Sequence, residues 1–112
     1  MTRQSYTAVV ERNCVWEGRF ETEPYEAAWA AEAIFFVRAL ESAGELGDVR
    51  ASVQISPDGM HWCDEGTLIE LPATAEAMAF GRVHHFGGWL RLAGRVPAEA
   101  QIKVIVYLAL KE

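Results

Sequence analysis

The sequence predicts an all-β protein, an antiparallel β-sandwich or jelly roll of about seven or eight strands in one domain over residues 1–112. Apolar and polar residues alternate near the C-terminus, and a strong turn signal separates two alternating segments in the middle of the chain. Short apolar runs are divided by loops that contain Gly and Pro. A hydrophobic fraction of 51% with 23% charged residues excludes a disordered chain, so a packed core is expected.

The first strand is expected over Tyr6–Trp16, and the segment after it has two interpretations. Its composition is helical, with many Ala and Glu residues and Thr22 in the position of an N-cap. Residues 34–37 are apolar without a break, which a strand buried on both faces accommodates better than a helix without a clean polar face. We therefore expect at most one short helix near residues 24–31 and then a strand over about Glu32–Glu41. The alternative is a single helix lying against the sheet.

A hairpin is expected around residues 56–59, which read Ser-Pro-Asp-Gly. Pro fixes φ, Asp bonds its own downstream backbone, and Gly accepts a positive φ. Residues 50–56 alternate before this turn as one strand. Residues 60–63 alternate after it, which predicts a partner strand with Met60 and Trp62 in the core.

The remaining strands are expected over Gly66–Leu71, Phe80–Val83, Trp89–Ala93 and the C-terminal segment. The C-terminal strand carries the clearest period of two. Its inward residues are Ile102, Val104, Val106, Leu108 and Leu110.

The C-terminal strand is apolar on its other side as well, where Ile105 and Tyr107 lie between Lys103 and Lys111. A strand that is apolar on both sides is either covered on both faces or in contact with another chain. In a domain this small, the pattern predicts a subunit interface at Ile105 and Tyr107, and we expect a homo-oligomer.

Several of these features resemble a class of small β-sandwich proteins. The turn and the residues after it fit a hairpin of the form Ser-x-Asp-Gly-x-x-Trp, with Trp62 at its end, and Gly88-Trp89-Leu90-Arg91 precedes the alternating last strand. The pattern over about residues 30–110 is similar to phage or virus-like head decoration and accessory proteins and to discoidin-like modules. This resemblance implies a jelly-roll-like fold used for assembly or recognition.

The charge balance argues against two classes of partner. A formal net charge of -6 and a pI near 5.0 oppose attraction to nucleic acid or to an anionic membrane surface. No apolar run reaches the roughly 20 residues that cross a bilayer, and the first residues do not have the pattern of a signal peptide. We expect the protein in the cytoplasm or in a virion-like particle. Cys14 and Cys63 are most simply free thiols, and a single disulfide between them is the alternative.

Metal-binding and catalytic patterns are weak. His61 and Cys63 share a face of the predicted strand, and His84 lies at another strand end, so these three side chains are the candidate zinc ligands. Their spacing matches no common site, because the chain has no Cys-x-x-Cys pair and the adjacent His84 and His85 point to opposite faces. We expect no metal and no cofactor.

No catalytic pair emerges either. No orienting third group accompanies a Cys63–His61 pair, and the adjacent carboxylates of Asp64 and Glu65 face opposite sides of a strand. We expect the protein not to be an enzyme.

The sequence therefore favours a non-catalytic structural or assembly protein that self-associates and decorates or completes a larger virus-like or shell-like assembly. The binding or interface residues are expected to be Trp89, Arg91, Ile105 and Tyr107. The first alternative is a carbohydrate- or ligand-binding module that uses Trp89 and Arg91 together with the neighbouring histidines. The second is a small metal-dependent enzyme of cupin-like shape.

Overall fold

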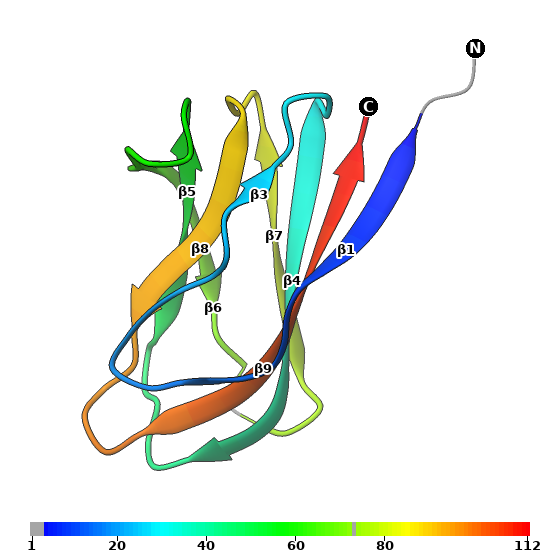
Figure 1. The fold of residues 1–112 in the computed structure, drawn as a ribbon. Helices are drawn as coiled ribbons and strands as arrows, with labels where there is room; N and C mark the ends of the chain where they lie inside the picture. Colours follow the sequence, from blue (N-terminus) through cyan, green and yellow to red (C-terminus); the bar gives the residue numbers. More distant parts are fainter. Residues whose placement is uncertain (1–3, 73) are drawn as a thin grey trace.

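The computed structural model describes residues 4–72 and 74–112, which form a two-layered β-sandwich without a helix (Figure 1). The all-β, antiparallel prediction is confirmed. The strands are β1 (Ser5–Trp16), β2 (Arg19–Glu21), β3 (Tyr25–Glu26), β4 (Glu32–Ala43), β5 (Arg50–Ser56), β6 (Cys63–Glu70), β7 (Met78–His84), β8 (Trp89–Arg95) and β9 (Gln101–Lys111).

One sheet has four strands in the order β1-β9-β4-β7, and we call it the first sheet. The second sheet has the order β2-β8-β5-β6, with β3 also paired to β8. Every strand pair is antiparallel. The C-terminal strand β9 is central in the first sheet, between β1 and β4, as Figure 1 shows.

The core lies between the two sheets and follows the alternation of each strand. The inward side chains of β4, β5, β8 and β9 are almost completely buried, while their neighbours in sequence face outward. The largest are Phe35, Val37, Val53, Leu90, Leu92, Ile102, Val104, Leu108 and Leu110. The inward set predicted for β9 is therefore in the core.

The ambiguous segment is extended rather than helical. The N-cap interpretation of Thr22 is wrong, because its hydroxyl oxygen accepts a hydrogen bond from the backbone N–H of Leu92 at 2.9 Å, within the second sheet. Residues 25–26 pair with β8, and residues 28–29 form a turn. The strand expected over Glu32–Glu41 is confirmed as β4, since pairing on both edges and burial of one face outweigh the helical propensity of Ala and Glu.

Two glycines allow the strands to approach other groups closely. A Cβ built on Gly81 would lie 2.7 Å from Cγ1 of Ile69, which belongs to the opposite sheet. A Cβ on Gly94 would lie 2.6 Å from the ring of Phe20 and 2.8 Å from the backbone oxygen of Arg50. The Phe20 ring that covers Gly94 also stacks on Trp16, with centroids 4.0 Å apart. Both positions require a residue without a side chain.

Candidate functional site

The outer face of the first sheet carries a row of apolar side chains that crosses all four strands. The strand registers pair Val9 with Tyr107, Tyr107 with Phe36, and Phe36 with Phe80. The rings of Phe36 and Phe80 lie 6.1 Å apart between centroids. Ile34 and Ala109 adjoin this row on one side. On the other side the register pairs Arg38 with Ile105 and Met78, so a half-buried guanidinium lies beside the row. We call this surface the outer face.

The outer face is open to solvent. Phe80 is 51% exposed and Val9 is 39% exposed, and Met78, which neighbours Phe80 on β7, is 56% exposed. These exposures show that no described segment of the chain covers this face. In an antiparallel sheet with one face in the core, the second face is normally polar, so an exposed apolar row is unusual.

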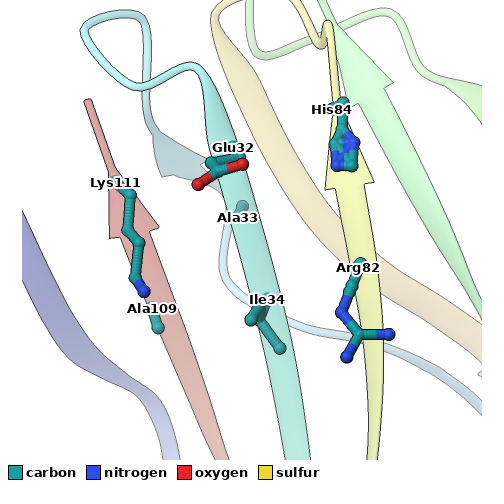
Figure 2. A pocket seen from close by; sticks show the side chains of 7 residues that line it. All are labelled: Glu32, Ala33, Ile34, Arg82, His84, Ala109 and Lys111. Atoms are coloured by element: carbon teal, nitrogen blue, oxygen red, sulfur yellow. The ribbon is translucent and has the colours of Figure 1, made fainter.

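Charged side chains lie at both ends of the outer face. At one end, Glu32, Lys111, Arg82 and His84 surround a shallow depression whose floor includes Ile34 (Figure 2). The guanidinium carbon of Arg82 lies 5.0 Å from the centroid of the Phe80 ring, so this charge adjoins the apolar row.

At the other end, a second shallow depression is lined by Val15, Glu41 and Lys103. The face thus has an apolar row with Arg38 beside it and charges of both signs at each end, an arrangement typical of a protein contact surface.

The predicted interface residues Ile105 and Tyr107 both lie on the outer face, although they differ in accessibility. Ile105 is only 7% exposed, whereas Tyr107 is half-buried within the apolar row. Tyr107 is therefore available for contact, and Ile105 mainly supports the surface.

Trp89 and Arg91 lie on the opposite side of the sandwich, on the outer side of β8 in the second sheet. Trp89 is half-buried, and a Cβ built on Gly59 would lie 3.1 Å from its ring. The β5–β6 turn therefore packs directly on Trp89. Since His84 faces outward on the first sheet, Trp89, Arg91 and His84 do not form one ligand site.

Arg91 is held by partners within the chain. Its Nε donates to Oε1 of Gln54 at 2.7 Å, Nη1 lies 3.2 Å from Oε2 of Glu21, and the guanidinium lies 4.3 Å from the centroid of the Trp62 ring. Gln54 in turn donates to Asp64 at 3.0 Å, so a polar network crosses the second sheet from β2 to β6. This network gives Nε and Nη1 of Arg91 partners within the chain.

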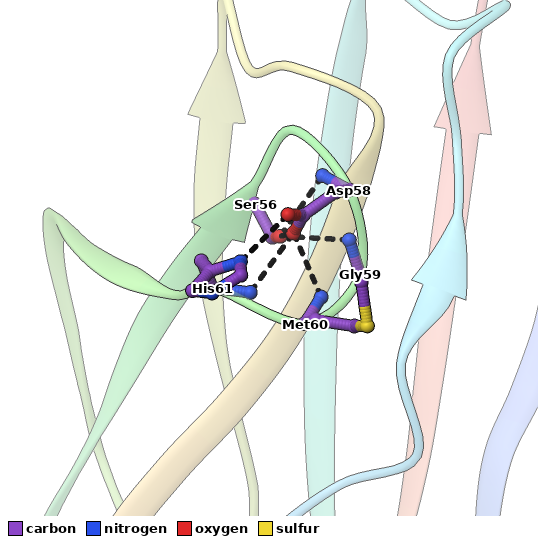
Figure 3. A network of polar contacts seen from close by, with 5 residues as sticks. All are labelled: Ser56, Asp58, Gly59, Met60 and His61. Atoms are coloured by element: carbon purple, nitrogen blue, oxygen red, sulfur yellow. Dashed lines mark hydrogen bonds and ion pairs between the residues drawn. The ribbon is translucent and has the colours of Figure 1, made fainter.

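The prediction that Met60 and Trp62 lie in the core is wrong, because the turn between β5 and β6 extends over residues 57–62. Figure 3 shows the polar contacts that hold this turn. One carboxylate oxygen of Asp58 accepts the backbone N–H groups of Met60 and His61, both at 2.9 Å, and its other oxygen contacts Nδ1 of His61 at 2.7 Å. These bonds keep residues 60–62 out of the strand, which begins at Cys63. Met60 is consequently 73% exposed, and Trp62 lies outside the core, against Arg91.

The hydrogen bonds from His61 and Met60 also hold the pKa of the Asp58 carboxyl well below its usual range. The backbone N–H of His61 is the main cause, and the imidazole and the N–H of Met60 add to it. Asp58 and His61 therefore organise the turn.

The three candidate zinc ligands are not brought together. His61 and Cys63 belong to the region of the β5–β6 turn, whereas His84 ends β7 on the outer face. Among residues 4–72 and 74–112, no group of three or more His, Cys, Asp or Glu side chains could hold a metal ion. The same residues include no disulfide partner for Cys14 or Cys63, which are free thiols.

Sequence reasoning missed Val9, Met78 and Phe80 as parts of the outer face. In β7 the inward positions are taken by small residues such as Ala79 and Gly81, while the large apolar side chains point outward. Hydrophobicity alone would place Phe80 in the core. The sequence does offer one signal, which is Gly81 within an apolar strand. A glycine in a strand often marks the face that another segment approaches closely, and this would place the adjacent Phe80 on the other face.

The comparisons with known proteins inform the fold alone. No protein-family model matches the chain, and no curated protein matches it. The crystal structure of the SPBc2 prophage-derived protein YomS is similar over 100% of this chain and 96% of that chain, with a TM-score of 0.65 and 8% sequence identity. The expected similarity to phage-like β-sandwich proteins is supported at the level of the fold, and the similarity to discoidin-like modules stays a prediction.

No helix within the described residues is long and apolar enough to cross a membrane.

Proposed function

We propose that this chain is a non-catalytic structural protein that self-associates through the outer face of its first sheet. The observation that carries the proposal is the row of Val9, Tyr107, Phe36 and Phe80 across four strands. Val9 and Phe80 are exposed, Tyr107 and Phe36 are half-buried, and the described chain leaves this face uncovered. Aromatic side chains at the centre of a surface with a charged rim are the side chains that dominate binding energy in protein interfaces.

The setting that we propose is a phage-related assembly, such as a virion-like particle that the protein decorates or completes. The support is the shared fold with a prophage-derived protein over nearly the whole of both chains. The acidic net charge of -6 fits this role, because it discourages binding to nucleic acid and leaves protein surfaces as the partners.

Light scattering coupled to size-exclusion chromatography tests the proposal over a dilution series. We expect the wild-type protein to form a dimer or larger assembly at high concentration and to dissociate on dilution. Phe80→Ser should shift the protein to monomer. The matched control is Leu68→Ser, because Leu68 is 52% exposed, as Phe80 is 51% exposed, but lies on the outer side of the second sheet.

A monomer at every concentration would overturn the proposal, as would equal effects of the Phe80 and Leu68 substitutions. A monomer whose tryptophan fluorescence responds to glycans would instead favour the carbohydrate- or ligand-binding module.

A further inference from the structure

We infer that the outer face binds a second copy of this chain, related by a two-fold axis that runs parallel to the strands between β9 and β4. This inference rests on the proposed self-association and adds the identity and orientation of the partner. The axis places β9 opposite β4 of the second copy and β1 opposite β7, so that each strand faces a different strand. Such an interface is isologous and closed.

The apolar row is self-complementary about this axis. Rotation about this axis keeps each side chain at the same level along the strands. It places each strand of the second copy opposite its exchange partner, β4 opposite β9 and β7 opposite β1. Tyr107 therefore faces Phe36 of the second copy, and Val9 faces Phe80. Aromatic and aliphatic groups that are exposed in one copy cover one another in the pair.

The charged side chains at the two ends of the outer face favour the same axis. Lys111 and Glu32 are paired in register at one end of the outer face, and Lys103 and Glu41 are paired at the other. Rotation about the strand-parallel axis places Lys111 opposite Glu32 of the second copy and Lys103 opposite Glu41. The other in-plane two-fold axis would place Lys111 opposite Lys103 and Glu32 opposite Glu41, which is repulsive.

These four side chains are available for such contacts. The ion pairs among the described residues lie elsewhere, at Arg50–Glu70, His61–Asp58 and Arg91–Glu21. Glu32, Glu41 and Lys111 are exposed, and Lys103 is half-buried. Substitution of these charges removes no ion pair of the described fold, but it places like charges opposite each other in register within each chain, so the urea midpoint of each variant is the control for its fold.

The size of the face predicts a weak pair. Strands lie about 4.8 Å apart, and the step from Lys103 to Lys111 spans about 27 Å at a rise of about 3.4 Å per residue. Because β7 reaches only to the level of Arg38, the face covers roughly 500 Å². Specific interfaces bury from about 600 Å² per partner, with about 800 Å² as the common size. The pair thus falls just below this range, which predicts a weak association that responds to dilution.

Charge complementation tests this arrangement. One variant carries Lys103→Glu and Lys111→Glu, and its outer face then has four acidic side chains at these positions. The other carries Glu32→Lys and Glu41→Lys, so that all four of these positions are basic. Each variant alone should associate at least a hundredfold more weakly than wild type, because every facing pair becomes repulsive. An equimolar mixture should restore a one-to-one dimer with affinity within tenfold of wild type.

Site-directed crosslinking gives a second readout with near-native chains. In a background of Cys14→Ser and Cys63→Ser, one copy carries Thr7→Cys and the other carries Arg82→Cys. The axis places these positions opposite each other, across sheets about 10 Å apart. A short bismaleimide should crosslink the mixture and neither variant alone.

The outcomes separate this inference from the proposed function. A wild-type dimer whose two charge variants also dimerise alone, or whose mixed cysteine variants fail to crosslink, would overturn the arrangement and leave self-association standing. A wild-type monomer at every concentration would overturn both.

Discussion

Replacement of Arg91 by Ala is expected to lower the free energy of unfolding, because the polar network on the second sheet is structural. The hydrogen bond from the guanidinium to Gln54 is 2.7 Å long, and its loss costs about 1.5–3 kcal/mol. The guanidinium also lies 4.3 Å from the centroid of the Trp62 ring, a contact of about 0.5–1 kcal/mol. Glu21 is 53% exposed, so its ion pair with Arg91 adds no more than about 0.5 kcal/mol.

Together these contacts predict a loss of about 3 kcal/mol, which urea denaturation monitored by tryptophan fluorescence measures. The matched control is Arg95→Ala on the same strand and the same side. Arg95 lies directly opposite Arg19 in the strand register, so its removal relieves a like-charge pair and should change stability by less than about 0.5 kcal/mol.

A double-mutant cycle separates the ring contact from the hydrogen bonds. Arg91→Ala should cost less in a Trp62→Leu background, by about the value of the cation–π contact. If Arg91→Ala were as mild as Arg95→Ala, the network would not stabilise the fold. The Arg91 guanidinium could then turn to a ligand at little cost to the fold, as a ligand-binding module requires.

Three further predictions concern individual residues. Gly94→Ala should lower the free energy of unfolding by about 2 kcal/mol, because its Cβ would lie 2.8 Å from a backbone oxygen. The control Gly87→Ala meets no atom closer than 3.6 Å and should be near neutral. Equal urea midpoints for the two variants would contradict this prediction. The pKa of Asp58 is lowered in the folded state. The free energy of unfolding that its carboxylate contributes is therefore present above the pKa of the unfolded chain, and it is lost as the pH falls through the pKa of the folded state. The melting temperature of wild type should therefore drop more steeply below about pH 4 than that of Asp58→Asn, and parallel profiles would exclude this role. Cys63 is exposed, while burial and Glu11 raise the pKa of the half-buried Cys14 thiol. Iodoacetamide should therefore alkylate Cys63 before Cys14, which mass spectrometry of the time course measures. The reverse order would refute this prediction.

The sandwich could be predicted from the sequence because its core follows strand periodicity. The inward residues of β9 and the apolar run of β4 are set by a period of two, which does not depend on knowledge of the partner strands. The short strands β2 and β3 were not predicted. Their pairing depends on β8, which is about 70 residues away, as the hydrogen bond between Thr22 and Leu92 illustrates.

The candidate site could be predicted in part. Tyr107 was identified because the C-terminal strand is apolar on both sides, but Phe80 was not, since its strand is too short and too mixed to show which side faces the core. Phe80 faces outward because Ile69 of the opposite sheet fills the space on the inner side, beside Gly81. Trp62 likewise lies outside the core. The Asp58 carboxylate accepts two backbone N–H groups beyond the expected turn, and this makes the turn longer.

The contrast between the two outer surfaces of the sandwich is the strongest reason to place the contact on the first sheet. On the second sheet, Arg91 and Gln54 are bonded within the chain, so a partner would have to displace existing contacts to use them. On the first sheet, Phe80 and Val9 are exposed without a cover, and no ion pair in the described chain occupies the charges at the rim. Covering this face removes apolar surface from water and breaks no ion pair of the described fold, so association there is favoured over association through the second sheet.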